Sequence, residues 1–250
     1  MGRETVDRLL GGRVALRQPA SGFRVSVDAV LLASTVPLAP GQRALDVGCG
    51  AGGATLCLAS RLPHARLCGI DRDAALIDFL RANVADNGFA DRVAAETLDL
   101  ADGVPDGLRG GFDHVLSNPP YLPPHRADVR SIADNVAAAT IESVPFADWL
   151  AFMAACCLPK GHVSVIHRAD RLEEILAAFA DLAGALRVLP IRPRAGDAAK
   201  RIIVTGRVGV HAPTILLPGL TLHGADGGYS EAARAIIEDA APLELDAAFG

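Results

Sequence analysis

The sequence predicts an α/β fold in which a mostly parallel β-sheet carries helices on both faces. Short β-like runs alternate with longer helical patterns along all 250 residues, as a parallel sheet with crossover helices requires. Half of the residues are apolar and 21% are charged, a composition that suits one large packed domain. The longest uninterrupted apolar run, Trp149 to Leu158, has ten residues, whereas a helix that crosses a bilayer needs about 20. We therefore expect no membrane partner.

In the N-terminal half, the expected helices begin and end at recognisable capping residues. Ser26 can cap a helix that carries Asp28 in its first turn, because a serine oxygen accepts an N–H that the helix leaves unpaired. Gly88 can end a later helix, because glycine readily adopts the left-handed conformation at a helix C-terminus. We expect helices at 26–36, from the glycines near residue 50 through Leu62 and at 74–87, and strands at 43–47 and at 65–70, the latter reaching Asp71.

The C-terminal half follows the same alternation. Pro119 and Pro120 prevent the preceding strand from continuing, because proline has no backbone N–H to give to a sheet. A stripe at helical spacing, Leu172, Ile175, Leu176 and Phe179, is typical of a helix packed on a sheet. We expect strands at 92–98, 112–117, 162–167, 185–189 and 201–208, the last two as an antiparallel hairpin, and helices at 146–157, around 172–179 and from 231 after Ser230. The sheet is thus expected to have seven strands.

Charge is unevenly distributed along the chain, although the formal net charge is only −5. Residues 1–24 hold five arginines against two acids, and residues 186–211 hold five arginines and one lysine against one acid. The last 26 residues hold six acids against one arginine. Two basic segments on an acidic body are compatible with a partner that carries phosphate groups.

We expect neither a secretory signal nor a metal or disulfide framework. The N-terminus, MGRETVDRLLGG, carries two acids and lacks an apolar stretch, so the cytoplasm is the expected location. The five cysteines include no CxxC pair, and their odd number argues against a disulfide framework. His162 and His167 lie five residues apart on a predicted strand, so they point to opposite faces and are poorly placed to share a metal.

A glycine-rich loop, Asp46-Val47-Gly48-Cys49-Gly50-Ala51-Gly52-Gly53, lies between a predicted strand and a predicted helix. Glycines let the backbone approach a ligand closely, and the helix N-terminus offers unpaired N–H groups to an anion. The loop therefore predicts a cofactor site. Because three of its glycines also match G-x-G-x-x-G, a nicotinamide dinucleotide site stays open at this point.

Acidic residues end the next two strands. Asp71 lies 23 residues after Gly48, where a carboxylate can accept both hydroxyl hydrogens of a ribose. This position fits NAD and S-adenosylmethionine equally. Asp99 ends the third strand, and its carboxylate can accept from an adenine amino group. A helix cap at Asp71 and a solvated turn at Asp99 are the structural alternatives.

The turn after the fourth strand, Asn118-Pro119-Pro120-Tyr121, distinguishes between these cofactors. A planar amine is a poor nucleophile because its lone pair is delocalised. The Asn118 side-chain carbonyl and the Pro119 backbone carbonyl can accept its two N–H groups, and these bonds strengthen as the nitrogen becomes cationic. Tyr121 offers a flat face on which a planar base or amide can stack. A dinucleotide oxidoreductase has no evident need of such a turn.

Together, these motifs resemble those of the class I S-adenosylmethionine-dependent methyltransferases, and among them the NPPY amino-methyltransferases. The similarity spans nearly the whole chain, through GFRVSVDAVLLAS, LDVGCGAGG, GIDRD, TLDLADG, LSNPPY and LHGADGGYSEAARAII. The first and last segments make the chain similar to the bacterial enzymes that methylate N6 of the adenine just 3′ of the anticodon in tRNA(Val).

This resemblance implies a Rossmann-like fold, S-adenosylmethionine as the cofactor, no metal, and in-line transfer of the sulfonium methyl group to a nitrogen. Residues 1–42 would contribute a helix that caps the cofactor, 43–209 the methyltransferase core and 210–250 an appendage. The implied cofactor-binding residues are Asp46, Gly48, Cys49, Gly50, Gly52, Asp71 for the ribose, Asp99 for the adenine, Leu100 and Asn118, and the implied catalytic residues are Asn118, Pro119, Pro120 and Tyr121.

An RNA substrate requires cationic side chains that contact its phosphates. Because most of this chain is acidic, such contacts must come from its arginines and lysines in the basic segments and after the Asn118 turn. The candidates are Arg126, Arg130, Arg192, Arg194, Lys200 and Arg201. Other activities stay open: N5-methylation of a glutamine in a release factor or ribosomal protein, methylation of an rRNA or DNA amino group, a nucleotide-binding dehydrogenase, or an inactive RNA-binding scaffold. Enzymes of the glutamine class usually carry a sizeable N-terminal helical domain, whereas only 42 residues precede the first core strand here, which favours tRNA.

Overall fold

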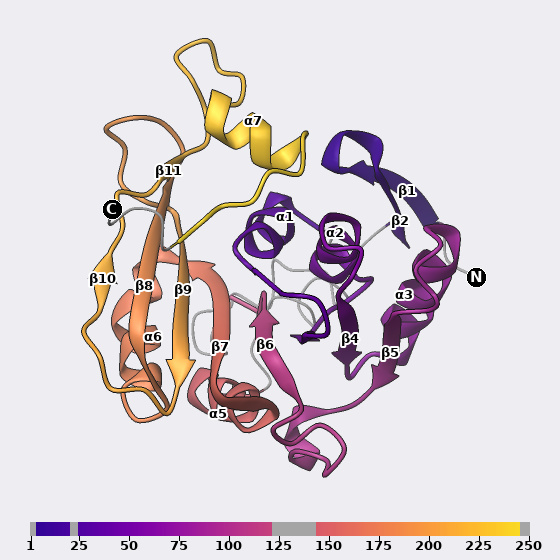
Figure 1. Cartoon of the computed structure of the whole chain (residues 1–250). Coiled ribbons are helices and arrows are strands. Elements are labelled where there is room, and N and C mark those ends of the chain that lie inside the picture. The colour runs from indigo at the N-terminus through magenta and orange to yellow at the C-terminus, as the bar shows by residue number, and fades with distance from the viewer. Residues whose placement is uncertain (1–3, 21–24, 122–143, 246–250) are drawn as a thin grey trace, which may run out of the picture.

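The computed structural model describes residues 4–20, 25–121 and 144–245, which form a large sheet flanked by helices and a separate hairpin (Figure 1). The strands are β1 (Glu4–Leu9), β2 (Val14–Pro19), β3 (Arg43–Val47), β4 (Arg66–Asp71), β5 (Val93–Thr97), β6 (Phe112–Ser117), β7 (Cys157–Arg168), β8 (Ala183–Arg192), β9 (Arg201–Val208), β10 (Ile215–Leu216) and β11 (Leu220–Thr221). The helices are α1 (Val27–Ser34), α2 (Gly53–Arg61), α3 (Ala74–Asp86), α5 (Phe146–Cys156), α6 (Leu172–Phe179) and α7 (Glu231–Ile237). None of the helices in the described residues is both long and apolar enough to cross a membrane.

The large sheet has the order β10-β8-β9-β7-β6-β3-β4-β5, with β11 also paired to β8. Parallel pairing runs from β5 to β7, and β9 lies antiparallel between β7 and β8, which confirms the predicted sheet and its terminal hairpin. The predicted strand count of seven was too low, because in the described residues β10 and β11 bring the total to nine. Each has two residues, too few for a periodic pattern to be visible in the sequence.

The predicted capping residues are confirmed. The Ser26 hydroxyl oxygen accepts the Asp28 N–H at the start of α1, at 3.3 Å, and the Ser230 oxygen accepts the Ala233 N–H at the start of α7, at 3.1 Å. Gly88 follows α3 with a φ of +71°. These local signals were visible in the sequence because each is satisfied within one helical turn.

Two apolar layers cover the two faces of the sheet. Helices α1, α2, α3 and α7 pack into one cluster of buried residues, and α5 and α6 pack into the other. Neighbouring residues of a strand alternate between the layers: Ala44 of β3 belongs to the first cluster, and Leu45 and Val47 belong to the second. Because helices cover both faces of the sheet, we look for a ligand site at the edges of the sheet, where the strands end.

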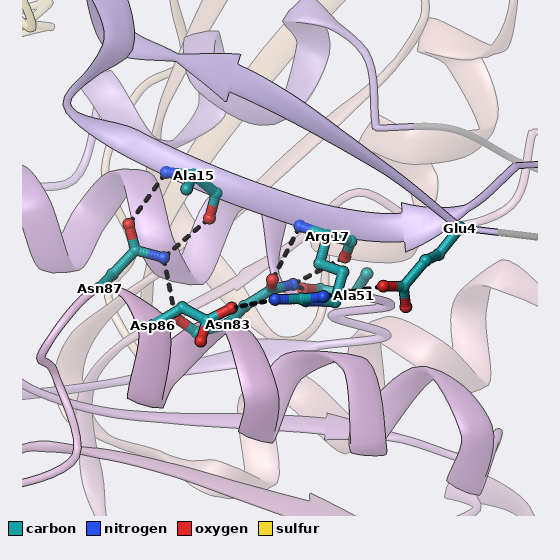
Figure 2. A network of polar contacts seen from close by, with 7 residues as sticks. All are labelled: Glu4, Ala15, Arg17, Ala51, Asn83, Asp86 and Asn87. Carbon is teal, nitrogen blue, oxygen red and sulfur yellow. Dashed lines mark hydrogen bonds and ion pairs between the residues drawn. The ribbon is translucent and has the colours of Figure 1, made fainter.

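The hairpin formed by β1 and β2 was not anticipated from the sequence. Two side-chain amides fasten it, one on α3 and one on the residue that follows α3, as Figure 2 shows: Asn83 accepts the Arg17 N–H at 2.7 Å and donates to the Arg17 carbonyl at 2.8 Å. Asn87, one turn further along, bonds both backbone groups of Ala15 in the same way. The two amides therefore take the place of a neighbouring strand. Asn83 also donates to the carbonyl of Ala51 in the glycine-rich loop, at 3.0 Å.

Asn83→Ala is expected to lower the free energy of unfolding by about 2 kcal/mol, because it leaves partly buried backbone groups of β2 and the buried Ala51 carbonyl of the glycine-rich loop without this partner. Chemical denaturation measures the change. Asp78→Ala, at an exposed position of the same helix, is the control and is expected to have little effect. Equal losses in the two variants would show that the amide network does not stabilise the fold.

Candidate active site

The candidate site lies at the carboxyl ends of β3, β4, β5 and β6. The chain passes from β3 to β4 and β5 on one side and then returns to place β6 on the other side of β3. Open α/β sheets bind ligands in the crevice at such a reversal of strand order. The glycine-rich loop follows β3 and the Asn118 turn follows β6, so the fold brings the two motifs to adjacent strand ends.

The glycines of the loop serve different purposes. Gly48, Gly50 and Gly52 all have positive φ angles, of +70°, +55° and +96°. A Cβ on Gly48 would lie 2.8 Å from Cζ2 of Trp149, and one on Gly52 would collide with Leu80 of α3. A Cβ on Gly50 would meet no described atom within 4 Å. Gly48 and Gly52 thus permit close packing, and Gly50 is the one of these three glycines beside which the described residues leave space.

Asp46 and Cys49 are both buried within the loop. The Asp46 carboxylate accepts the backbone N–H of Thr55 at 3.0 Å and its hydroxyl at 2.6 Å, which fastens the end of β3 to α2. Burial raises the pKa of Asp46 to about 6. The Cys49 side chain packs near Gly69 of β4, and burial raises the pKa of its thiol well above the usual range. Both side chains therefore point into the protein.

Asp71 reaches across to the glycine-rich loop. One of its carboxylate oxygens accepts the Gly50 N–H and the other accepts the Asp73 N–H, both at 2.9 Å. Asp73, and not Asp71, caps α3 by accepting the Ala75 N–H. The helix cap considered as the alternative for Asp71 was therefore wrong. Burial raises the pKa of Asp71.

Asp99 lies after the neighbouring strand β5. Its carboxylate accepts the Ala101 N–H at 3.0 Å and caps a short 3₁₀ helix, Leu100–Asp102. Asp99 and Leu100 are both half-buried. Since β4 and β5 are paired in parallel, their ends place Asp71 and Asp99 along one edge of the sheet.

The turn after β6 is connected to the glycine-rich loop through its neighbours. The Ser117 hydroxyl donates to the carbonyl of Val47 at 2.6 Å, and the indole N–H of Trp149 donates to the Ser117 oxygen at 3.0 Å. Trp149 also packs against Gly48, so one side chain contacts both motifs. Asn118 follows directly and is half-buried. The Tyr121 hydroxyl faces two acceptors, the side-chain oxygen of Asn118 and the Asp28 carboxylate, the latter at 2.9 Å.

The predicted phosphate contacts fall into three groups. Arg126 and Arg130 lie outside the described residues. Arg194 and Lys200 are exposed on the loop between β8 and β9, at the same edge as the site. Arg192 and Arg201 have protein partners: Arg192 donates to the Pro218 carbonyl at 2.8 Å, and Arg201 forms an ion pair of 2.9 Å with Asp28.

Two residues of the site were missed from the sequence. Asp28 was noted only as a first-turn residue of a helix, yet it lies buried beside Tyr121. One feature of the sequence could have indicated this role. Asp28 is the one charged residue of a helix, VDAVLLAS, that is otherwise almost entirely apolar and has no polar face for the carboxylate to lie on. Trp149 is the only tryptophan of the chain, and its contact with Gly48 joins segments about 100 residues apart in sequence. No local pattern predicts that contact.

Comparison with known proteins gives consistent results. Residues 21–143 match the model of the methyltransferase small domain family. The chain is 30% identical to a tRNA1(Val) (adenine(37)-N6)-methyltransferase of Porphyromonas gingivalis, over 87% of this chain and 88% of that protein. It is 27% identical to the enzyme of the same name from Aeromonas hydrophila, over 84% and 86%. Among solved structures, a predicted O-methyltransferase from Agrobacterium tumefaciens superimposes with a TM-score of 0.72 and 27% identity, over 88% of this chain and 99% of that one.

Proposed function

Because this chain belongs to the tRNA1(Val) (adenine(37)-N6)-methyltransferase family, we propose that it transfers a methyl group from S-adenosylmethionine to N6 of an adenine in tRNA, the one just 3′ of the anticodon. One observation supports this most directly: Ser117 and Trp149 join the Asn118 turn to the glycine-rich loop, so that a cofactor in the loop would lie beside the amine acceptors of the turn. In this proposal residues 43–209 form the catalytic core, and the enzyme acts in the cytoplasm.

The residues at the strand ends fit the cofactor. The space that the described residues leave beside Gly50 would admit a ligand next to the backbone. Each oxygen of the Asp71 carboxylate accepts one backbone N–H, which leaves further lone pairs for the two hydroxyl groups of a ribose. Asp99 at the end of β5 can accept from an adenine amino group. When bound, S-adenosylmethionine supplies an electrophilic methyl group on a positively charged sulfur.

The Asn118 turn would activate the amine. An amine with two hydrogens matches two carbonyl acceptors, the Asn118 side chain and the Pro119 backbone. The bonds strengthen as the nitrogen gains positive charge, so they stabilise the transition state more than the ground state. Arg201 lies over one face of the Tyr121 ring, with Cζ 4.8 Å from the centroid, so a stacked base would use the opposite face. Two N–H acceptors suit an amine better than a hydroxyl group, which has a single hydrogen to donate.

A parallel assay tests the proposal. The purified chain is incubated with radiolabelled S-adenosylmethionine and, separately, with tRNA lacking the modification, rRNA, duplex DNA and a release factor. The expected result is label in tRNA that nucleoside analysis identifies as N6-methyladenosine. Label in the release factor would instead support glutamine methylation, and label on a ribose or base oxygen would contradict amine methylation.

Exposed cations beside the site are expected to contact tRNA phosphates. Replacing Arg194 and Lys200 together by glutamine should weaken tRNA binding and reduce the slope of log K against log salt by about 1–2, since each lost phosphate contact removes about 0.7–0.9. The matched control replaces Arg66 and Lys160, exposed cations near the opposite ends of their strands, by glutamine. Equal slopes in the two double variants would exclude the loop from the RNA surface.

A further inference from the structure

We propose that His167 and Arg171 are positioning residues that hold the backbone of the Asn118 turn, so that the Pro119 carbonyl stays available to the target amine. The inference rests on the proposed function, in which that carbonyl accepts one hydrogen of the amine. It assigns a role in the reaction to two buried side chains, one near the end of β7 and one in the 3₁₀ helix Ala169–Arg171 that follows it.

Strand β7 continues beyond the end of its partner β6. Ser117, the last residue of β6, pairs with Val165, whereas β7 runs on to Arg168. Pro119 and Pro120 have no backbone N–H, so they cannot extend the pairing. Side chains must therefore hold the backbone of the turn where it passes the end of β7.

His167 carries its hydrogen on the nitrogen that faces the turn. Nδ1 accepts the Arg168 N–H at 2.9 Å, and burial lowers the pKa of the ring to about 4, so the neutral ring has its one hydrogen on Nε2. Nε2 is buried, and within the described residues it completes no hydrogen bond of normal geometry. The Pro120 carbonyl is close enough to raise the pKa of the ring, as an acceptor of a ring N–H does. This carbonyl is therefore the acceptor that Nε2 faces.

Two aromatic rings hold the imidazole in this orientation. The His167 ring contacts the Tyr121 ring edge to face, with 5.1 Å between centroids, and the Phe146 ring of α5 in the same manner at 5.6 Å. His167 is fully buried. Because interiors are closely packed, the imidazole has little freedom to turn away from the Asn118 turn.

Arg171 provides a second donor, to the next carbonyl of the turn. It is only 7% exposed, and its Nε and Nη2 donate to the two carboxylate oxygens of Glu174 on α6, both at 2.6 Å. This bidentate pair fixes the plane of the guanidinium group. Nη1 donates to the Tyr121 carbonyl at 3.3 Å. His167 and Arg171 thus offer N–H groups to two successive carbonyls, those of Pro120 and Tyr121.

Holding these two carbonyls restricts the Pro119 carbonyl as well. Each residue has two soft backbone dihedrals, and the proline ring locks φ at about −65°. Once the peptide plane between Pro120 and Tyr121 is held, ψ of Pro120 is the one dihedral that still moves the plane of the Pro119 carbonyl. In the part of the chain that the structure describes, no backbone N–H donates to that carbonyl. It is therefore an acceptor that the fold orients but does not use.

Matched substitutions at His167 test the inference on the full chain with unmodified tRNA and S-adenosylmethionine. His167→Gln keeps an N–H donor at the end of an unbranched side chain, and His167→Met has a similar shape without a donor. We expect His167→Met to lower kcat about 10-fold and His167→Gln to stay within about threefold of wild type, since a displacement of about 1 Å can cost about 100-fold in rate. KM for tRNA and the cofactor Kd, followed by Trp149 fluorescence, should change less than about threefold in both variants.

Thermal stability separates positioning from folding at this residue. His167→Met removes a buried N–H that lacks a complete hydrogen bond, so its melting temperature should equal or exceed that of His167→Gln. The positioning role thus predicts that the less active variant is at least as stable. Equal kcat in the two variants would overturn it, and so would a His167→Met variant that loses stability and kcat together.

Arg171→Lys keeps the charge beside the acidic partner but loses the planar fork that also reaches the Tyr121 carbonyl, so it should lower kcat about 10-fold. Arg81→Lys, on α3, is the matched control. Arg81 also pairs with an acid three residues away, Asp78, and donates to a backbone carbonyl, that of Ala95 at 3.1 Å. Its kcat should be unchanged. This pair carries the test if the histidine variants do not fold, and wild-type kcat in Arg171→Lys would then overturn the inference.

The outcomes also separate this inference from the proposed function. In a chain that methylates tRNA, a kcat that does not depend on the two donors overturns the positioning role alone. A change confined to the melting temperature or to the cofactor Kd does the same, because it assigns the two side chains to the fold or to cofactor binding. A wild-type chain that does not methylate tRNA overturns the proposed function, and the positioning role with it.

Discussion

Asn118→Ala is expected to lower kcat about 10²–10³-fold while the Kd for S-adenosylmethionine stays within about threefold. The side-chain carbonyl would bond the amine more strongly in the transition state than in the ground state, so its loss acts on kcat. The magnitude is taken from the loss of one oxyanion-hole donor, which costs about 3–4 kcal/mol. Single-turnover methylation measures the rate, and a cofactor titration followed by Trp149 fluorescence measures the Kd.

Asn87→Ala is the matched control for this variant. It makes the same substitution at the residue that follows α3, where the lost bonds fasten Ala15 of the hairpin. We expect lower stability with kcat unchanged, the reverse of the result at Asn118. A kcat of Asn118→Ala within threefold of wild type would show that the side chain does not hold the amine and would remove the turn from the proposed mechanism.

Gly50→Ala is expected to raise the Kd for S-adenosylmethionine about 100-fold. In the protein alone, the added Cβ meets no described atom within 4 Å, so the fold should tolerate it apart from the cost of the positive φ. With a cofactor against the loop, the same methyl group would occupy ligand space, and overpacking of this kind costs about 1–3 kcal/mol. Isothermal titration calorimetry with the cofactor measures the change.

Gly110→Ala provides a close match to this variant. Gly110 has a φ of +56°, nearly that of Gly50, and a Cβ there also meets no described neighbour within 4 Å. It precedes β6, away from the carboxyl ends of the strands. Both variants should therefore lose similar stability, and only Gly50→Ala should lose cofactor affinity. Unchanged affinity in Gly50→Ala would place the cofactor elsewhere.

The two variants also report on different halves of the site. If Gly50→Ala raises the cofactor Kd but leaves kcat normal at saturating cofactor, the loop acts in binding. If Asn118→Ala lowers kcat but leaves the cofactor Kd normal, the turn acts in activating the amine. If instead both variants changed Kd and kcat together, the contact through Trp149 and Ser117 would couple the two motifs more tightly than proposed.

Much of the fold was predictable because its signals are local. The strands at 112–117 and 201–208 were predicted with the bounds that the structure has, and the caps at Ser26 and Ser230 were recognised. The strand that starts at Cys157 is longer than the predicted 162–167. Its first part contains Pro159 and Gly161, which are unfavourable inside a strand, so the sequence does not indicate a strand there. The β1–β2 hairpin was missed, since its attachment depends on two asparagines, in and just after α3, that lie about 70 residues away in sequence.

The sequence by itself determined where the strands end and which chemical groups follow them: the glycine-rich loop, Asp71, Asp99 and the Asn118 turn. Only the tertiary structure decided the partners of those groups. Tyr121 and Asp28 are 93 residues apart, and Asp28 and Arg201 are 173 apart, so no helical or strand period connects them. Helix caps and hydrophobic periodicity depend on residues a few positions apart, so they are visible in the sequence. These contacts, in contrast, form only when the sheet has brought α1, β6 and β9 together.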